Sequence, residues 1–380
     1  MKLQSKFPSL GTTIFSKIST MANQYNALNL GQGFPDFSPS PYLLEKAHAH
    51  TQAGANQYAP MSGAAPLRCA IQSLHRDFYQ AEIDADQEIT VTSGATEAIF
   101  CAISAVVHPG DEVIVFDPSY DSYIPNIELN GGVPVRINLN EDFEIPWGKV
   151  KESISAKTRC IIINSPHNPS GALLKTEELD LLWDMVKDTN IVIISDEVYQ
   201  HLIFDNKTHV SPFNDERFRD RTFAISSFGK TFHVTGWKVG YCVAAPNLTQ
   251  EFRKVHQYIT YCTPANLQLA IADMLDNKRD EVRGLSAFYQ QKRDLFQDLI
   301  KDSKFKLLPC SGSYFQLVDY SELDDCDDLE FCEKLIKEHG LAAIPISVFY
   351  DTPPAQKVIR FCFAKEDETL LQAKEKLAKL

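Results

Sequence analysis

Residues 226–241 read SSFGKTFHVTGWKVGY, and their residue types could carry covalent chemistry. Lys230 lies there beside Gly229 and close to Ser227, so a ligand could approach the backbone around it. A lysine that is deprotonated part of the time can form a Schiff base with a nearby aldehyde. Lys238 adds a second cation, which favours an anionic ligand. A solvated surface loop is the alternative, so the interpretation depends on the other segments.

A second candidate segment, Ser93 to Thr96, reads SGAT and lies between an apolar run and a helical pattern. The first amides of a helix have no partner within it, and the small side chains of Gly94 and Ala95 would leave room for a phosphate against them. The alternative is an ordinary helix cap made by Ser93 or Thr92.

Polar residues follow three further apolar runs. SDEVY supplies Asp196, a carboxylate that needs a partner where it ends a buried strand, and Tyr199. A pyridinium nitrogen or a backbone cap would serve as that partner. SPHNPSG supplies Asn168 in a turn that proline and glycine stiffen. DPSYDSY supplies Tyr120, which would stack on an aromatic ring or simply fill a groove.

Arg360 lies within the apolar run VIRFCFA near the C-terminus. A guanidinium among such residues needs a carboxylate, and its fork matches one with two parallel hydrogen bonds. That carboxylate would belong to a ligand or to an internal salt bridge. His48 and His50 have no companion ligands, so we interpret them as helix-surface residues and expect no metal site.

The elements around these residues must bring them together. From about residue 88 to 245, short β-branched runs alternate with amphipathic helical stretches, which predicts a parallel sheet buried on both faces. In such open α/β sheets, ligands bind at the carboxyl ends of the strands. Because each polar segment follows a predicted strand, we expect these segments along one edge of the sheet.

The length of 380 residues predicts two domains, or one large α/β domain with additions. From about residue 248 the pattern turns helical, and a smaller α+β domain follows a long helix near 280–301. We expect an N-terminal arm over 1–45 that packs on the small domain or a partner subunit, a large domain over 46–280 and a small domain over 281–380.

Composition excludes several classes of protein. A net charge of −13 argues against a nucleic-acid-binding face. The longest apolar runs, CIIIN and IVIIS, fall far short of the ~20 residues that span a bilayer. Nine cysteines without a C-x-x-C motif indicate reduced thiols, and no signal peptide is apparent, so we expect a cytoplasmic protein that binds no membrane.

Taken together, the motifs resemble the pyridoxal-phosphate-dependent aminotransferases of fold type I, class I/II. The resemblance rests on N-P-x-G, S-D-E-V-Y, S-F-x-K-T and T-G-W-K-x-G in this order, and it extends from NLGQGFPDF to VIRFCFAK. It implies an α/β fold whose large, cofactor-binding domain has a mostly parallel seven-stranded sheet between helices. It also implies a cytoplasmic homodimer with shared active sites and pyridoxal 5′-phosphate as cofactor.

The resemblance also implies a role for each candidate residue. Lys230 would bind the cofactor covalently and, once released, move a proton between the substrate and the cofactor. Asp196 would pair with the pyridinium nitrogen. Arg360, with Asn168 and the backbone of Gly33, would bind the substrate carboxylate. The remaining cofactor contacts would be Asn168 and Tyr199 at the phenolic oxygen, Tyr120 on the ring face, and Ser93, Gly94, Ala95, Thr96, Ser227, Lys238 and the partner's Tyr58 around the phosphate.

Two departures from the family pattern bear on the substrate. Many relatives have an arginine where this chain has Lys238. The lysine offers the phosphate a point charge in place of the planar fork of a guanidinium. The segment TYCTPANLQ lacks the arginine that aspartate-type relatives use for a second carboxylate, so we do not expect aspartate as the preferred substrate. Phe15, Phe34, Tyr58 and Tyr120 are apolar candidates for contacting a substrate side chain.

Within the family, LGTTIFSK, GFPDFSP and NQYAPMSG are most similar to the kynurenine and glutamine aminotransferase branch, and there to bacterial methionine aminotransferases. We therefore expect amino-group transfer between methionine or an aromatic amino acid, or else glutamine or kynurenine, and a 2-oxo acid. Cysteine-conjugate β-lyase activity on the same scaffold is the alternative, and a binding protein without turnover is a weaker one. A nicotinamide-dependent dehydrogenase is excluded because no G-x-G-x-x-G follows a strand.

Overall fold

The computed structural model describes residues 3–8, 11–377 and 380. Residues 1–2 and 9–10 of the predicted arm, and 378–379 of the predicted small domain, lie outside the described residues.

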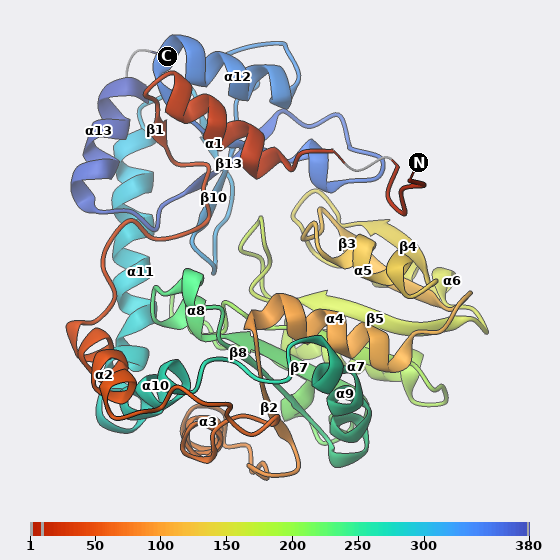
Figure 1. Ribbon diagram of the computed structural model, residues 1–380. Helices are drawn as coiled ribbons and strands as arrows, with labels where there is room; N and C mark the ends of the chain where they lie inside the picture. Colours follow the sequence, from red (N-terminus) through yellow and green to blue (C-terminus); the bar gives the residue numbers. More distant parts are fainter. Residues whose placement is uncertain (1–2, 9–10, 378–379) are drawn as a thin grey trace.

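The central element is a seven-stranded sheet (Figure 1). Its strands, in spatial order, are β2 (Ile89–Thr92), β8 (Gly240–Ala244), β7 (Thr222–Ser227), β6 (Val192–Asp196), β5 (Thr158–Asn164), β3 (Glu112–Asp117) and β4 (Val133–Asn138). The strand β8 runs opposite to the other six strands of this sheet, which confirms the predicted mostly parallel sheet.

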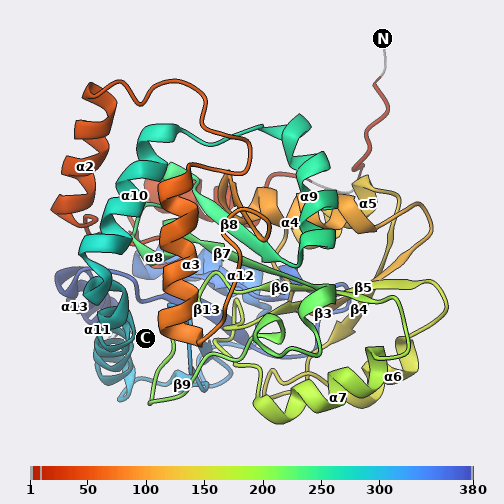
Figure 2. The same cartoon turned by 90° about the horizontal axis from the view of Figure 1, so that it is seen from below.

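Helices cover both faces of this sheet (Figure 2). One face carries α4 (Gly94–Val106), α5 (Tyr123–Leu129) and α9 (Pro246–Ile259), and the other carries α6 (Trp147–Ser153) and α7 (Thr176–Val186). Successive side chains of β5 alternate between the two cores: Cys160 and Ile162 pack with α4, whereas Ile161 and Ile163 pack with α7. A strand buried on both faces explains the continuous apolar run in the sequence.

A second group of helices lies at one end of the sheet. The helices α2 (Pro41–Gln52) and α3 (Ala65–Tyr79) both contact α10 (Ala265–Asn277). The long helix α11 (Arg279–Ile300) follows directly and runs along one side of the molecule to α13 (Asp367–Leu377) (Figure 1). This helix matches the one expected near residues 280–301.

The C-terminal part of the chain forms a small antiparallel sheet in the order β12 (Ile344–Pro345), β13 (Val358–Cys362), β10 (Phe315–Asp319) and β9 (Lys306–Leu307). The helices α1 (Ile14–Gln24) and α12 (Asp328–His339) lie beside it (Figure 1). N-terminal β1 (Leu28–Asn29) pairs in parallel with β11 (Leu341–Ala342). The proposed domain boundaries at residues 45 and 280 stay a prediction.

Short elements complete the chain: α8 (Phe228–Thr231) and the 3₁₀ helices Pro212–Asn214, Arg219–Arg221, Thr235–Trp237 and Ser347–Phe349. The parallel strands β5, β6 and β7 end at Asn164, Asp196 and Ser227, so these three residues lie along one edge of the large sheet. Within the described part of the chain, no helix combines the length and apolar character needed to cross a membrane.

Candidate active site

A cavity of about 250 Å³ lies at the carboxyl ends of β5, β6 and β7. Its walls come from both sheets and from the N-terminal segment. The cavity brings together residues that the sequence analysis found on separate segments: Gly33, Gly94, Ala95, Thr96, Tyr120, Asn168, Asp196, Tyr199, Ser227, Lys230, Lys238 and Arg360.

Lys230 lies on the short helix α8, immediately after β7. Its Nζ donates a hydrogen bond to the Tyr314 hydroxyl at 2.6 Å and a longer one to the Gly33 carbonyl at 3.4 Å. Burial above all, with the positive charges of Arg360 and Lys238, lowers the pKa of Lys230 to about 8. An amine with this lowered pKa is neutral part of the time, and the neutral form is the nucleophile and base.

The segment from Ser93 to Thr96 begins α4, and the Ser93 side chain makes no cap hydrogen bond. Gly94 adopts a φ of +75°, and a Cβ added there would lie 3.3 Å from the Lys238 Nζ. A Cβ on Gly240 of β8 would come within 2.8 Å of the Ala95 nitrogen. Glycine at both positions therefore lets unpaired helix amides and one ammonium group converge, which is an anion-binding arrangement.

Asp196 ends β6 and is buried, as the sequence predicted. It accepts a hydrogen bond from the Tyr123 hydroxyl at 2.6 Å and one from the Val198 amide at 3.3 Å. Burial raises the pKa of Asp196 to about 6, although the Tyr123 hydrogen bond opposes that shift. A cationic ring nitrogen in the cavity would favour the ionised carboxylate.

Arg360 lies on β13 and is 1% exposed. Its two terminal nitrogens donate to the Asn168 side-chain oxygen at 2.9 Å and to the Gly31 carbonyl at 3.2 Å, while its Nε has no partner within the described part of the chain. No acidic side chain among the described residues forms an ion pair with it, so the internal salt bridge is wrong. Its guanidinium lies 3.9 Å from the Phe315 ring centroid. This buried cation is available to a ligand carboxylate.

Three candidates lie outside the cavity lining. Tyr58 is 85% exposed, with its ring 5.7 Å from that of Tyr261. Ser93 lies at the N-cap position of α4, and its amide donates a hydrogen bond to the Glu97 carboxylate at 2.5 Å. Phe34 is 45% exposed, whereas Phe15 does line the cavity. His48 and His50 lie on α2, where His50 pairs with the Asp273 carboxylate at 2.9 Å.

Sequence reasoning missed Tyr123 and Tyr314, whose hydroxyls contact Asp196 and Lys230. Tyr123 lies in the DPSYDSY segment, where its place after Tyr120 was a usable signal. Tyr314 precedes β10 and had no such signal, because its contact with Lys230 joins parts of the chain that lie far apart in sequence. Further cavity residues that the motifs did not indicate are Gln32, Ile99, Asn164, Val198, Thr235 and Phe315.

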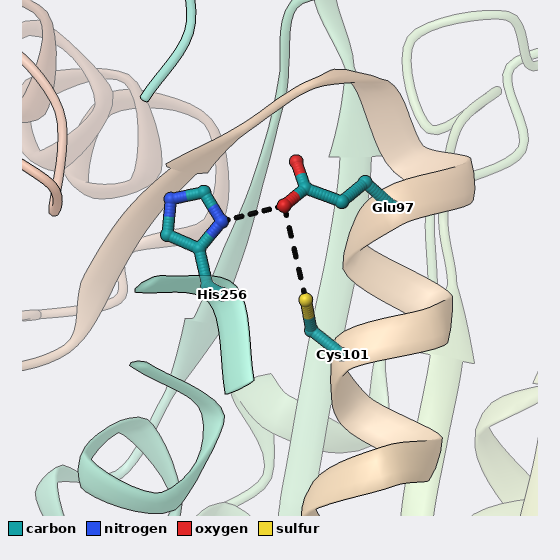
Figure 3. Close-up of side chains that lie close together, drawn as sticks. All are labelled: Glu97, Cys101 and His256. Atoms are coloured by element: carbon teal, nitrogen blue, oxygen red, sulfur yellow. Dashed lines mark hydrogen bonds and ion pairs between the residues drawn. The ribbon is translucent and has the colours of Figure 1, made fainter. Parts of the chain in front are cut away.

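Figure 3 shows three buried side chains that lie close together: Glu97 and Cys101 on α4, and His256 on α9. The Glu97 carboxylate accepts hydrogen bonds from His256 Nδ1 at 2.6 Å, from Thr260 Oγ1 at 2.7 Å and from the Ser93 amide at 2.5 Å. The other imidazole nitrogen of His256 contacts the Met61 carbonyl at 3.0 Å. These hydrogen bonds make the cluster a brace that joins the start of α4 to α9 and to the segment after Tyr58.

Comparisons with known proteins agree with this geometry. A family model described as "Aminotransferase class I and II" matches residues 25–377. The chain is 49% identical to a methionine aminotransferase from Escherichia coli, over 99% of this chain and 98% of the relative. A crystal structure from Escherichia coli, reported to identify a methionine aminotransferase function, superposes with a TM-score of 0.98 over 100% of both chains at 49% identity.

Two further relatives show the breadth of the match. A probable N-succinyldiaminopimelate aminotransferase from Mycobacterium tuberculosis is 37% identical over 99% of this chain and 98% of its own length. Kynurenine–oxoglutarate transaminase 1 from Homo sapiens is 32% identical over 94% of this chain and 93% of its own length. The chain therefore belongs to the class I and II aminotransferase family, with the type I fold of these enzymes. The predicted family, fold class and aminotransferase activity are confirmed.

Proposed function

We propose that the protein is a pyridoxal-phosphate-dependent aminotransferase that moves an amino group between methionine or an aromatic amino acid and a 2-oxo acid. One observation carries the proposal: the buried Arg360, which has no acidic partner among the described residues, faces the same cavity as Lys230 and Asp196. A carboxylate-binding cation beside a neutral amine fits an α-amino acid substrate.

The donor set of the cavity fits the cofactor. The unpaired helix amides and Lys238 suit its phosphate, and Thr96 and Ser227 add hydroxyl groups to the cavity lining. A ring whose nitrogen is protonated suits Asp196, the buried carboxylate. When bound, pyridoxal phosphate withdraws electrons from the substrate's α-carbon and so makes its proton acidic.

The side chains around the ring position it and exclude water. Tyr120 supplies an aromatic face in the cavity, while Asn168 and Tyr199 supply polar groups for the ring's phenolic oxygen. The Tyr123 hydroxyl orients the Asp196 carboxylate by its 2.6 Å hydrogen bond. A carboxylate fixed in this way would hold the proton on the ring nitrogen of the bound cofactor.

Lys230 carries the proton. Its lowered pKa of about 8, due above all to burial, gives an amine that would accept the proton from the substrate's α-carbon and pass it to the bound cofactor. Arg360 binds the substrate carboxylate together with Asn168 and the Gly33 backbone, which fixes the α-carbon next to that amine.

We propose a homodimer with shared sites. Four aromatic and apolar side chains are exposed at residue 58 and within residues 258–261: Tyr58, Tyr258, Ile259 and Tyr261. Exposed groups of this kind are typical of protein interfaces. Tyr58 lies outside its own subunit's cavity, so its expected phosphate contact would be made in the partner's site.

The substrate side chain is proposed from the cavity's apolar lining and from the relatives. Phe15, Ile99 and Phe315 line the cavity, and such surfaces suit a thioether or an aromatic ring. The named activities of the relatives include methionine and kynurenine transamination. The lack of arginine in residues 260–268 disfavours a second carboxylate on the substrate.

A panel of amino donors and 2-oxo acid acceptors, assayed on the purified protein, tests this proposal. We expect a new amino acid from methionine and from phenylalanine or tyrosine, and slow turnover of aspartate. Pyruvate and ammonia from a cysteine conjugate would instead indicate the β-lyase. Absence of any product, with no cofactor adduct on the Lys230 peptide after borohydride, would overturn the proposal.

A further inference from the structure

Tyr314 is a fully buried side chain that the proposed mechanism leaves without a role. It lies just before β10, and its hydroxyl donates a hydrogen bond to the Gly33 carbonyl at 2.5 Å. Its oxygen also accepts the 2.6 Å hydrogen bond from Lys230. Burial raises the pKa of Tyr314 well above its usual value, so the hydroxyl keeps its proton and its oxygen acts toward Lys230 as an acceptor.

The directions of these bonds orient the amine. A neutral amine has two N–H groups and one lone pair. The Tyr314 oxygen and the Gly33 carbonyl accept the two N–H groups, at 2.6 and 3.4 Å. The lone pair of the Lys230 nitrogen has no partner in this arrangement and is therefore free to take up the proton of a substrate bound in the cavity.

We propose that Tyr314 holds the Lys230 amine in a rest position, defined as the pair of hydrogen bonds to Tyr314 and Gly33, whenever that amine is not bound to the cofactor. This inference rests on the proposed function and adds a positioning residue to it. In this position Tyr314 also ties Lys230 to the segment around Gly33, whose backbone is proposed to contact the substrate carboxylate.

The packing around Tyr314 makes the position rigid. Its ring packs edge-on against Phe315 at 4.8 Å and Tyr199 at 5.1 Å, measured between ring centroids. Phe315 in turn lies against the Arg360 guanidinium at 3.9 Å. Because the Tyr314 ring is fixed, its hydroxyl loses little conformational entropy each time it binds the Lys230 amine.

The test uses the variant Tyr314→Phe, which removes the hydroxyl and keeps the ring. Tyr289→Phe is the matched control, because Tyr289 is a buried neighbour whose ring centroid lies 6.0 Å from that of Tyr314. Its hydroxyl has no hydrogen-bond partner among the described residues. The groups that otherwise act on the Lys230 charge are Asp196, Lys238, Arg360 and Cys362, and both variants leave them unchanged.

The first measurement needs no cofactor. The rate at which cyanate modifies Lys230 in the apoenzyme, followed against pH by mass spectrometry of its peptide, reports the pKa of the amine. An ammonium group loses an acceptor in Tyr314→Phe, so its pKa falls by on the order of one unit. Tyr289→Phe keeps the wild-type profile.

The second measurement is steady-state kinetics on the enzyme loaded with cofactor. We expect a kcat about tenfold lower in Tyr314→Phe, with cofactor absorbance retained. A raised KM with an unchanged lysine profile would overturn the proposal, because Tyr314 would then only hold the Gly33 segment. Failure of the proposed function would give a different result from either of these outcomes. In that case the wild-type protein itself would form no borohydride-trapped adduct at Lys230.

Discussion

Lys230 lies in a cavity with two other cations, Lys238 and Arg360, and each has a separate task in the proposed chemistry. The amine at Lys230 must be neutral part of the time, and burial, aided by the two charges, lowers its pKa to about 8. Lys238 lies beside the first turn of α4 and Arg360 lies on the small sheet, so each can bind a different anionic group of a ligand. In this proposal the same residue type would serve covalent chemistry at position 230 and charge pairing at position 238.

Replacing each lysine tests this division. Lys230→Ala removes the amine that moves the proton, so turnover should fall by about a thousandfold or more, with no borohydride-trapped adduct. Lys238→Ala should instead raise the dissociation constant of the cofactor, while borohydride still traps the adduct on Lys230. Absorbance titration and peptide mass spectrometry distinguish the two, and near-wild-type turnover in Lys230→Ala would refute the mechanism.

Arg360 offers a second test at this scale. Arg360→Lys keeps a positive charge but loses the planar fork, so the substrate carboxylate loses a hydrogen bond to a charged group, which is typically worth about 1.5–3 kcal/mol. We expect the KM for the amino acid to rise by about 100-fold, with the cofactor spectrum unchanged. Initial rates over a range of amino acid concentrations measure this, and an unaltered KM would show that the carboxylate binds elsewhere.

At the scale of elements, the brace formed by Glu97 and His256 fixes where α4 begins. Burial raises the pKa of Glu97, but hydrogen bonds from His256, Thr260 and Ser93 more than offset this and hold it below its usual value. A depressed folded-state pKa adds stability above the unfolded-state value and loses it as the pH falls through the folded-state value. The brace therefore works at neutral pH and fails in acid.

Glu97→Gln tests the brace. It should lower the free energy of unfolding by about 1–3 kcal/mol at neutral pH, because buried donors lose a charged acceptor. The difference from wild type should shrink as the pH falls below the usual range of a carboxylate. Urea unfolding at several pH values measures it, with Glu177→Gln, an exposed glutamate in the first turn of α7, as the control. A pH-independent difference would contradict this account.

The elements also show how far sequence patterns reach. The apolar runs of β5 and β6 and the polar residues that end them were predicted, because a strand buried on both faces leaves an unbroken apolar pattern. Edge strand β4 (Val133–Asn138) was missed, since its side chains are only partly buried and its sequence is mixed. The contacts of Tyr314 with Gly33 and Lys230 were also missed, because they depend on how three distant segments meet.

At the scale of the whole molecule, the cavity is made by parts of the chain that lie far apart in sequence. Gly33 comes from the N-terminal segment, Lys230 from the large sheet's edge and Arg360 from the small sheet. Tyr58 lies outside this cavity on an exposed surface. A site that also needs Tyr58 would be complete only when a second copy supplies it, and twofold symmetry would then give two identical sites.

Mixing two damaged variants tests this arrangement. Tyr58→Ala damages the residue proposed to act in the partner's site, and Lys230→Ala damages its own subunit's site. A mixed dimer has one site with both defects and one site with neither, so an equal mixture that exchanges subunits should recover about a quarter of wild-type activity. Activity after unfolding and refolding the two variants together measures this, and each variant refolded alone is the control. No gain on mixing, or a monomer by light scattering, would refute the shared site.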